Sequence, residues 1–338
     1  MGHIHPTFRG IHMRISPLLK SLVCAAFVAT TAASMATEAW PTRPVRLVVG
    51  FPPGGPTDIV ARIVGQSLSK ELGQPVIIEN RGGAGGTVAA AYVAKQKPDG
   101  DTLMLTAESV QTRAAAVFRK LPYDPVADFE PIGKFAKQRV LMVVNPTLAA
   151  KDVKEFVAYA KAHPGELNYS ATYSASSHFG GALFGVLNGV DLTLVNYPGG
   201  GQPITDLMAG VVQVGFFTES TVAQQVQAGK LRALAIAADE RSALFPQLPT
   251  LQQAGAARMD ISPWFGLVAP AKTPPEIIAK ASAALTRAIA SEDFEKRLAP
   301  IGAVAIKGST PASFAADIKK EIDYWKKFVK DSNFPIVD

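Results

Sequence analysis

The chain has 338 residues, with 34 Lys and Arg against 28 Asp and Glu, and these charges are scattered along it. A formal net charge of +6 without a basic block excludes the electrostatic footprint of a nucleic-acid-binding protein. The single cysteine, Cys24, excludes thiolate zinc sites and Cys-x-x-Cys redox chemistry, so we expect neither a metal nor another cofactor. This length usually folds as two domains of about 150 residues each.

The first 39 residues have the pattern of a secretory signal peptide. A short basic segment at 13–20 precedes an apolar run at 22–29, and small residues continue to Ala39. A membrane anchor would need about 20 apolar residues, and this run is shorter. We therefore expect residues 1–39 to be a leader cleaved after Ala36 or Ala39, with Met13 as an alternative start, and we expect a periplasmic protein.

Without this leader the chain has no cysteine and only two histidines, His163 and His178. A chain without thiols suits an oxidising compartment. His178 follows Ser176 and Ser177, but neighbours at a helix start rarely face one another, and no Gly-x-Ser-x-Gly elbow is present. We expect a structural histidine and no catalytic residue.

From residue 45 onward, short β-branched runs alternate with segments of helical periodicity. The first series predicts strands at 45–49, 76–78 and 103–105, a helix from about 56 that ends at Gly73, and a short helix at 87–95. Strand, glycine loop, helix and strand in this order are typical of βαβ units and a parallel sheet.

A second series begins in the middle of the chain. Its predicted strands are 140–144, 167–170, 192–195, 212–216 and 231–236, with helices at 151–162 and from about 177 to 187. Beyond Trp264 the pattern turns helical, at 275–290 and 311–330. We expect two α/β halves, with the final helical segment packing back on the first half.

Two loops carry the pattern of an anion site. Gly54 and Gly55 precede a predicted helix, whose first turn offers free N–H groups and a positive dipole end. The alternative is a tight turn in which Thr57 or Asp58 caps the helix. The polar loop at 172–177 likewise offers either a second anion contact or simple capping, whereas Gly82–Gly86 lacks the third glycine of a dinucleotide loop and favours a structural turn.

Taken in order, these loops and several others resemble one family, the Bug-type extracytoplasmic receptors of tripartite tricarboxylate transporters. The resemblance covers about residues 40–330, and its motifs are FPPGGPTD at 51–58, ENRGGAGG at 79–86, KPDG at 97–100, LPYDPVADFEP at 121–131, GKLRALA at 229–235 and LPT at 248–250.

The resemblance implies a periplasmic-binding-protein fold of two α/β domains joined by two crossovers, with a ligand cleft between them. The implied domains are 40–141 with 263–338, and 142–262. It also implies a monomer that captures a small organic carboxylate and delivers it to a two-subunit membrane permease. The residues implied or expected to line the ligand site are Phe51, Gly54, Gly55, Thr57, Asp58, Glu108, Ser109, Tyr173, Ser174, Ser176, Tyr197, Phe217 and Thr218.

The departures from the family pattern fall in these pocket loops. Tyr173 stands where a small residue is common, and Phe217 replaces an aspartate. A more aromatic wall favours a cyclic or aromatic carboxylate, and Glu108 disfavours a second carboxylate beside it. The alternatives are that Tyr173 packs within its own domain, that Phe217 is plain core and that Glu108 is solvated at the rim.

Two other functions remain as alternatives. A sensor subunit that presents its ligand to a membrane kinase would use the same fold. A secreted hydrolase is the second, and the absence of a triad pattern in the sequence argues against it.

Overall fold

The computed structural model describes residues 1, 2, 40–173, 175–197, 201–332, 334 and 336. Residues from Trp40 onward form one compact unit, to which the following description applies. The predicted signal peptide falls on residues that lie outside this described part, so its cleavage stays a prediction.

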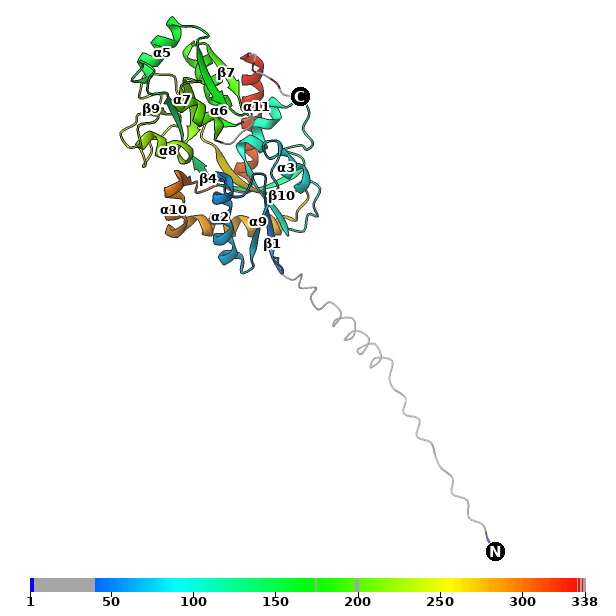
Figure 1. Cartoon of the computed structure of the whole chain (residues 1–338). Coiled ribbons are helices and arrows are strands. Elements are labelled where there is room, and N and C mark those ends of the chain that lie inside the picture. Colours follow the sequence, from blue (N-terminus) through cyan, green and yellow to red (C-terminus); the bar gives the residue numbers. More distant parts are fainter. Residues whose placement is uncertain (3–39, 174, 198–200, 333, 335, 337–338) are drawn as a thin grey trace. The chain divides into compact units, whose positions relative to one another are not determined.

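One sheet has six strands, in the order β11-β4-β10-β3-β1-β2 (Figure 1). Its strands are β1 (Val45–Val49), β2 (Val76–Asn80), β3 (Thr102–Ala107), β4 (Phe129–Gln138), β10 (Trp264–Pro270) and β11 (Ala303–Ala305). As predicted, β1, β2 and β3 are parallel, but β10 runs antiparallel to β3 and β4. The predicted parallel pairing of β1, β2 and β3 is therefore confirmed, whereas the antiparallel strands β4, β10 and β11 were not predicted.

The helices expected at 275–290 and 311–330 are present, but the strand β10 before them was not predicted. This strand is buried at every residue, so its side chains show no polar alternation. A short apolar run of this kind cannot be told from a buried helix by periodicity alone.

The second sheet has five strands, in the order β7-β6-β8-β5-β9. All five lie within a residue or two of their predicted ranges: β5 (Val140–Val144), β6 (Leu167–Ala171), β7 (Leu192–Asn196), β8 (Val214–Thr218) and β9 (Arg232–Ile236). β6 is parallel to β7 and β8, whereas β5 is antiparallel to β8 and β9.

Helices cover both faces of each sheet, because alternate residues of the central strands pack into different cores. On β1, Leu47 belongs to a core with α2 and α9, while Val48 packs towards α3 and α11. On β5, Met142 packs with α5 and α6, while Leu141 packs in the core that also holds residues of α7 and α8.

The longer helices are α2 (Pro56–Leu72), α5 (Val153–Ala162), α6 (Ser176–Asn188), α7 (Gln202–Ala209), α8 (Glu219–Gln227), α9 (Pro275–Ala290) and α11 (Pro311–Asp331). The shorter ones are η1 (Ala84–Gly86), α3 (Thr87–Val93), the π-helix η2 (Ser109–Arg113), α4 (Ala114–Val117), α10 (Glu292–Leu298) and η3 (Ala299–Ile301).

Two crossovers join the sheets. The first passes through Arg139 between β4 and β5, and the second runs from the end of β9 to β10. This confirms an α/β fold of the periplasmic-binding-protein type. The helix α11 runs alongside both sheets (Figure 1). Its Phe314 packs in a core of the first sheet, whereas Trp325 and Phe328 pack in a core of the second. The domain division at 142 and 262 stays a prediction, and its assignment of residues 263–338 to one domain did not anticipate this double packing.

Candidate functional site

The loops that follow β1, β3, β6 and β8 line one cavity of about 320 Å³, here called the strand-end cavity. Ligands of open α/β sheets bind at such strand ends. Eight of the predicted site residues line it: Phe51, Thr57, Glu108, Ser109, Tyr173, Ser176, Phe217 and Thr218.

Three helices begin at this cavity. α2 starts at Pro56, α6 at Ser176 and α8 at Glu219, and none of the three has a side-chain N-cap hydrogen bond. Lining residues include Thr57 and Ser177 in the first turns of α2 and α6. The first N–H of α8, that of Glu219, already donates to the Arg139 carbonyl (3.0 Å), so the free N–H groups are those of the α2 and α6 starts. Unsatisfied N–H groups at a helix start carry a partial positive charge, so this arrangement attracts an anion without a cationic side chain.

The loop before α2 is held in place by Asp58. Its carboxylate accepts hydrogen bonds from the Gly54 N–H (2.9 Å), from Arg62 Nε (2.8 Å) and from Asn80 Nδ2 (2.9 Å). Burial would raise the pKa of Asp58, but the bonds from Arg62, Gly54 and Asn80 together lower it. The N-cap position is Gly55 with extended backbone, so neither Thr57 nor Asp58 is the helix cap of the alternative hypothesis.

Aromatic side chains form much of the cavity wall. Phe51, Tyr173 and Phe217 line it and are half-buried, and the buried Phe216 and Phe265 lie behind this wall as further lining residues. Tyr173 also makes an edge-on contact with His178, at 5.0 Å between ring centroids. Tyr173 thus both packs within its own half and faces the cavity, and Phe217 is not plain core.

His178 is fully buried beneath Tyr173, between Phe179 and Phe334. Its two ring nitrogens have no hydrogen-bond partner within the described residues. Burial lowers the pKa of His178 to about 4, so the ring is neutral at pH 7. Since it is not bonded to either serine beside it, the structure agrees with a packing role.

Glu108 is buried rather than solvated at the rim, so that alternative was wrong. Its Oε1 accepts hydrogen bonds from Arg113 Nη1 (3.1 Å) and from Ser176 Oγ (3.3 Å). Arg113 also bonds the Ser176 hydroxyl (3.0 Å), and its guanidinium lies over the rings of Phe179 and Trp325. Burial raises the pKa of Glu108, against the opposing effect of Arg113. This pair ties η2 of the first half to α6 of the second.

The other predicted site residues do not line the described cavity. Gly54 and Gly55 are not among the lining residues, although Pro56 and Thr57 directly after them are, and the Tyr197 hydroxyl donates to Asp206 Oδ2 at 2.7 Å. Asp58 serves the loop as described above, and Ser174 lies outside the described residues. The sequence prediction missed Gln138 at the end of β4, Pro263 in the second crossover and Phe265 in β10. Nothing in their local pattern distinguishes them from ordinary buried residues.

Comparison with known proteins assigns the chain to a family. Residues 60–334 match the family described as "Tripartite tricarboxylate transporter family receptor". The chain belongs to this receptor family. It is 33% identical over 310 residues to the protein BugT of Bordetella pertussis, which covers 90% of this chain and 95% of BugT.

Solved receptor structures have the same fold. An adipate-bound protein of R. palustris is 32% identical with a TM-score of 0.79, and the match covers 88% of this chain and 100% of the adipate-bound chain. MatC of Rhodopseudomonas palustris with bound malate is 36% identical with a TM-score of 0.75, and the match covers 86% of this chain and 100% of the MatC chain. In the described part of this receptor, no helix has both the length and the apolar character that a membrane span requires.

Proposed function

We propose that this receptor binds a small monocarboxylate with a cyclic or aromatic body in the strand-end cavity, and performs no catalysis. The observation that carries the proposal is that the cavity combines helix N-termini with aromatic side chains. The α2 and α6 starts offer free N–H groups to one carboxylate, while the half-buried rings of Phe51, Tyr173 and Phe217 offer contact to an apolar body.

The charge of the cavity argues against a second carboxylate. Among its described lining residues, Glu108 is the one with an ionisable acidic or basic side chain, and its cation Arg113 is already bonded to it. A dicarboxylate would place its second charge in this wall without a new cation. The adipate- and malate-bound relatives support carboxylate capture, whereas the preference for one carboxylate is specific to this chain's wall.

We further infer that the leader is removed on export, that the mature receptor is a periplasmic monomer, and that it delivers its ligand to a two-subunit membrane permease. The family description supports delivery to a transporter. Closure would bring residues 142–262 towards the rest of the chain, since the cavity has walls from both sheets. N-terminal sequencing of the exported protein should find Thr37 or Trp40 first.

Calorimetry of residues 40–338 with benzoate, nicotinate, succinate and citrate tests the ligand class. Benzoate or nicotinate should bind more tightly than either aliphatic acid. Tightest binding to citrate or succinate would contradict the monocarboxylate assignment and leave carboxylate capture in place. The Thr57→Val variant, which removes one hydroxyl at the α2 start, should weaken all four acids together, whereas the exposed Thr193→Val control should weaken none.

A further inference from the structure

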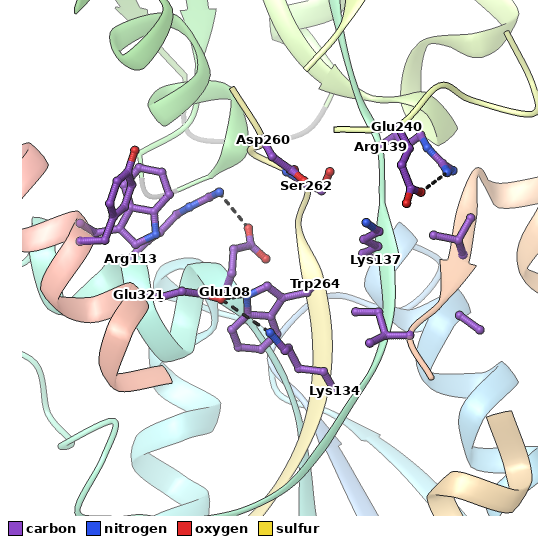
Figure 2. A pocket seen from close by; sticks show the side chains of 15 residues that line it. Glu108, Arg113, Lys134, Lys137, Arg139, Glu240, Asp260, Ser262, Trp264 and Glu321 are labelled. Carbon is purple, nitrogen blue, oxygen red and sulfur yellow. Dashed lines mark hydrogen bonds and ion pairs between the residues drawn. The ribbon is translucent and has the colours of Figure 1, made fainter. Parts of the chain in front are cut away.

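A second and larger cavity, of about 690 Å³, lies along the two crossovers and is here called the crossover cavity (Figure 2). Its walls include β4 and Arg139 from the first crossover, Asp260 and Ser262 from the second, and residues of α11 and β11. The proposed capture of a carboxylate at the strand ends makes no use of this cavity.

An irregularity of β4 brings three cations to this cavity. Phe265 pairs with Ala136, but the next residue, Gly266, pairs with Lys134, so Phe135 is an extra residue of β4. In a regular strand Lys137 and Arg139 would share one face and Lys134 would point to the other. The bulge shifts this alternation, and Lys134, Lys137 and Arg139 all line the cavity (Figure 2).

Lys137 forms no ion pair with the described carboxylates that line the cavity. Lys134 Nζ pairs with Asp317 (2.5 Å) and lies 3.8 Å from Glu321. Arg139 pairs at 3.4 Å with Glu240, whose side chain is 69% exposed, so solvent screens this contact. Lys137 is half-buried and has no carboxylate partner in the described part of the chain.

Two of the remaining acidic groups of the wall are already paired with donors, whereas the exposed Asp260 keeps its negative charge. Glu108 is bonded to Arg113, and Glu321 accepts hydrogen bonds from Trp264 Nε1. Asp260 accepts the N–H of Ser262 at 2.8 Å.

Two buried polar atoms of the cavity residues lack a partner among the described residues. Arg139 Nε and Ser262 Oγ are both inaccessible and make no hydrogen bond. Arg139 is 8% exposed, so leaving a guanidinium N–H unpaired there is costly. Buried groups of this kind are normally satisfied by a protein group, a water molecule or an ion.

We propose that the crossover cavity is a second binding site, for a small oxyanion with two or more negative charges such as phosphate. Lys137 supplies a positive charge without an ion-pair partner among the described residues, while Arg139 and Ser262 carry the unpaired donors and would have to turn towards the cavity to reach the anion. An anion held by Arg139 and Ser262 joins the two crossovers, because each of these residues belongs to a different one. The site is separate from the strand-end cavity, although Glu108 contributes to both walls.

Calorimetric titration of residues 40–338 with sodium phosphate, at constant ionic strength set with sodium chloride, tests this site. Lys137→Gln should bind phosphate about tenfold more weakly, equivalent to about 1.4 kcal/mol. Ser262→Ala should also weaken it, since it removes one donor. Lys161→Gln removes the same charge from the exposed end of α5 and should leave the affinity unchanged.

Thermal unfolding without phosphate establishes that each variant is folded before it is titrated. Failure of the wild-type protein to bind phosphate would overturn the proposal. Equal affinities for the wild type and for Lys137→Gln would overturn it as well, because the contact would then be elsewhere. Neither result bears on the proposed monocarboxylate site, which contains no lysine in its described wall.

Discussion

The strand-end cavity and the crossover cavity both suit anions, but they do so by different physical means. The first has helix starts and aromatic walls, and the second has two lysines of β4 and Arg139 of the first crossover. Helix starts are fixed by the backbone and cost no side-chain entropy to hold, whereas lysine side chains must be ordered when they bind. The comparison teaches that charged residues alone would point to the crossover cavity and not to the cavity that we propose for the carboxylate.

One ion pair forms part of both walls. Glu108 lines each cavity, and its partner Arg113 bonds Ser176 at the start of α6. Substitutions at this pair should therefore lower the stability of the whole folded unit. Substitutions elsewhere in either cavity should change only the affinity of that cavity for its ligand.

The largest effect is expected from Arg113→Met. Because this substitution leaves Glu108 buried without its cation, we expect a loss of about 3–5 kcal/mol in the free energy of unfolding. The double variant with Glu108→Gln should recover much of that loss. Arg258→Met, which breaks an exposed pair with Asp239, should change stability little. Urea unfolding measures all of these.

The Arg113→Met deficit should depend on pH. Burial raises the pKa of Glu108, and removing Arg113 leaves that effect unopposed. A raised carboxylate pKa makes the folded state bind the proton more readily than the unfolded state, so the deficit should shrink as pH falls towards 4.5. A deficit that stays constant between pH 8 and 4.5 would show that Glu108 is not the source.

A smaller effect on stability is expected when low pH protonates His178, whose ring packs beneath Tyr173 in the aromatic wall of the strand-end cavity. Its folded pKa of about 4 lies below the ordinary value of 6.5, so protons bind the unfolded state preferentially between these values. Stability should fall as pH drops through this window, by on the order of 3 kcal/mol. His178→Leu should therefore gain stability relative to the wild type as pH falls from 7 to 4.5. His163→Leu is the control, and equal pH profiles for all three proteins would contradict this role.

The smallest effect is expected at Tyr173. Aromatic contacts contribute about 0.5–1.5 kcal/mol, so Tyr173→Ala should weaken benzoate by about 2- to 13-fold and succinate less. Phosphate affinity should be unchanged, because Tyr173 does not line the crossover cavity. Tyr159→Ala, which removes a tyrosine stacked on His163 at the end of α5, is the control. Equal losses for benzoate and succinate would contradict a role of the ring in selectivity.

The sequence predicted most of the fold because its strands and helices carry clear periodicity. β5 and α9 lie at their predicted residues, and α2 ends at Gly73 in the left-handed conformation that a C-cap glycine adopts. β10 was missed because a fully buried strand has no alternation, and η2 was missed because a π-helix has no separate sequence signal.

The site was predictable only where motifs mark it. Phe51, Thr57 and Tyr173 were found because they stand in loops with a recognisable pattern, and they line the cavity. The cavity residues Gln138 and Phe265 depend on how the crossovers meet, which no local pattern states. The three aligned cations were likewise hidden, since the bulge at Phe135 follows from pairing with β10 rather than from β4 alone.

A crystal structure of residues 40–338 with bound benzoate tests the central claim most directly. We predict that the carboxylate lies within hydrogen-bond distance of first-turn groups of α2 and α6, with the ring against Tyr173 and Phe217. A benzoate carboxylate bound instead by Lys137 and Arg139 in the crossover cavity, with the strand-end cavity holding only solvent, would contradict the account.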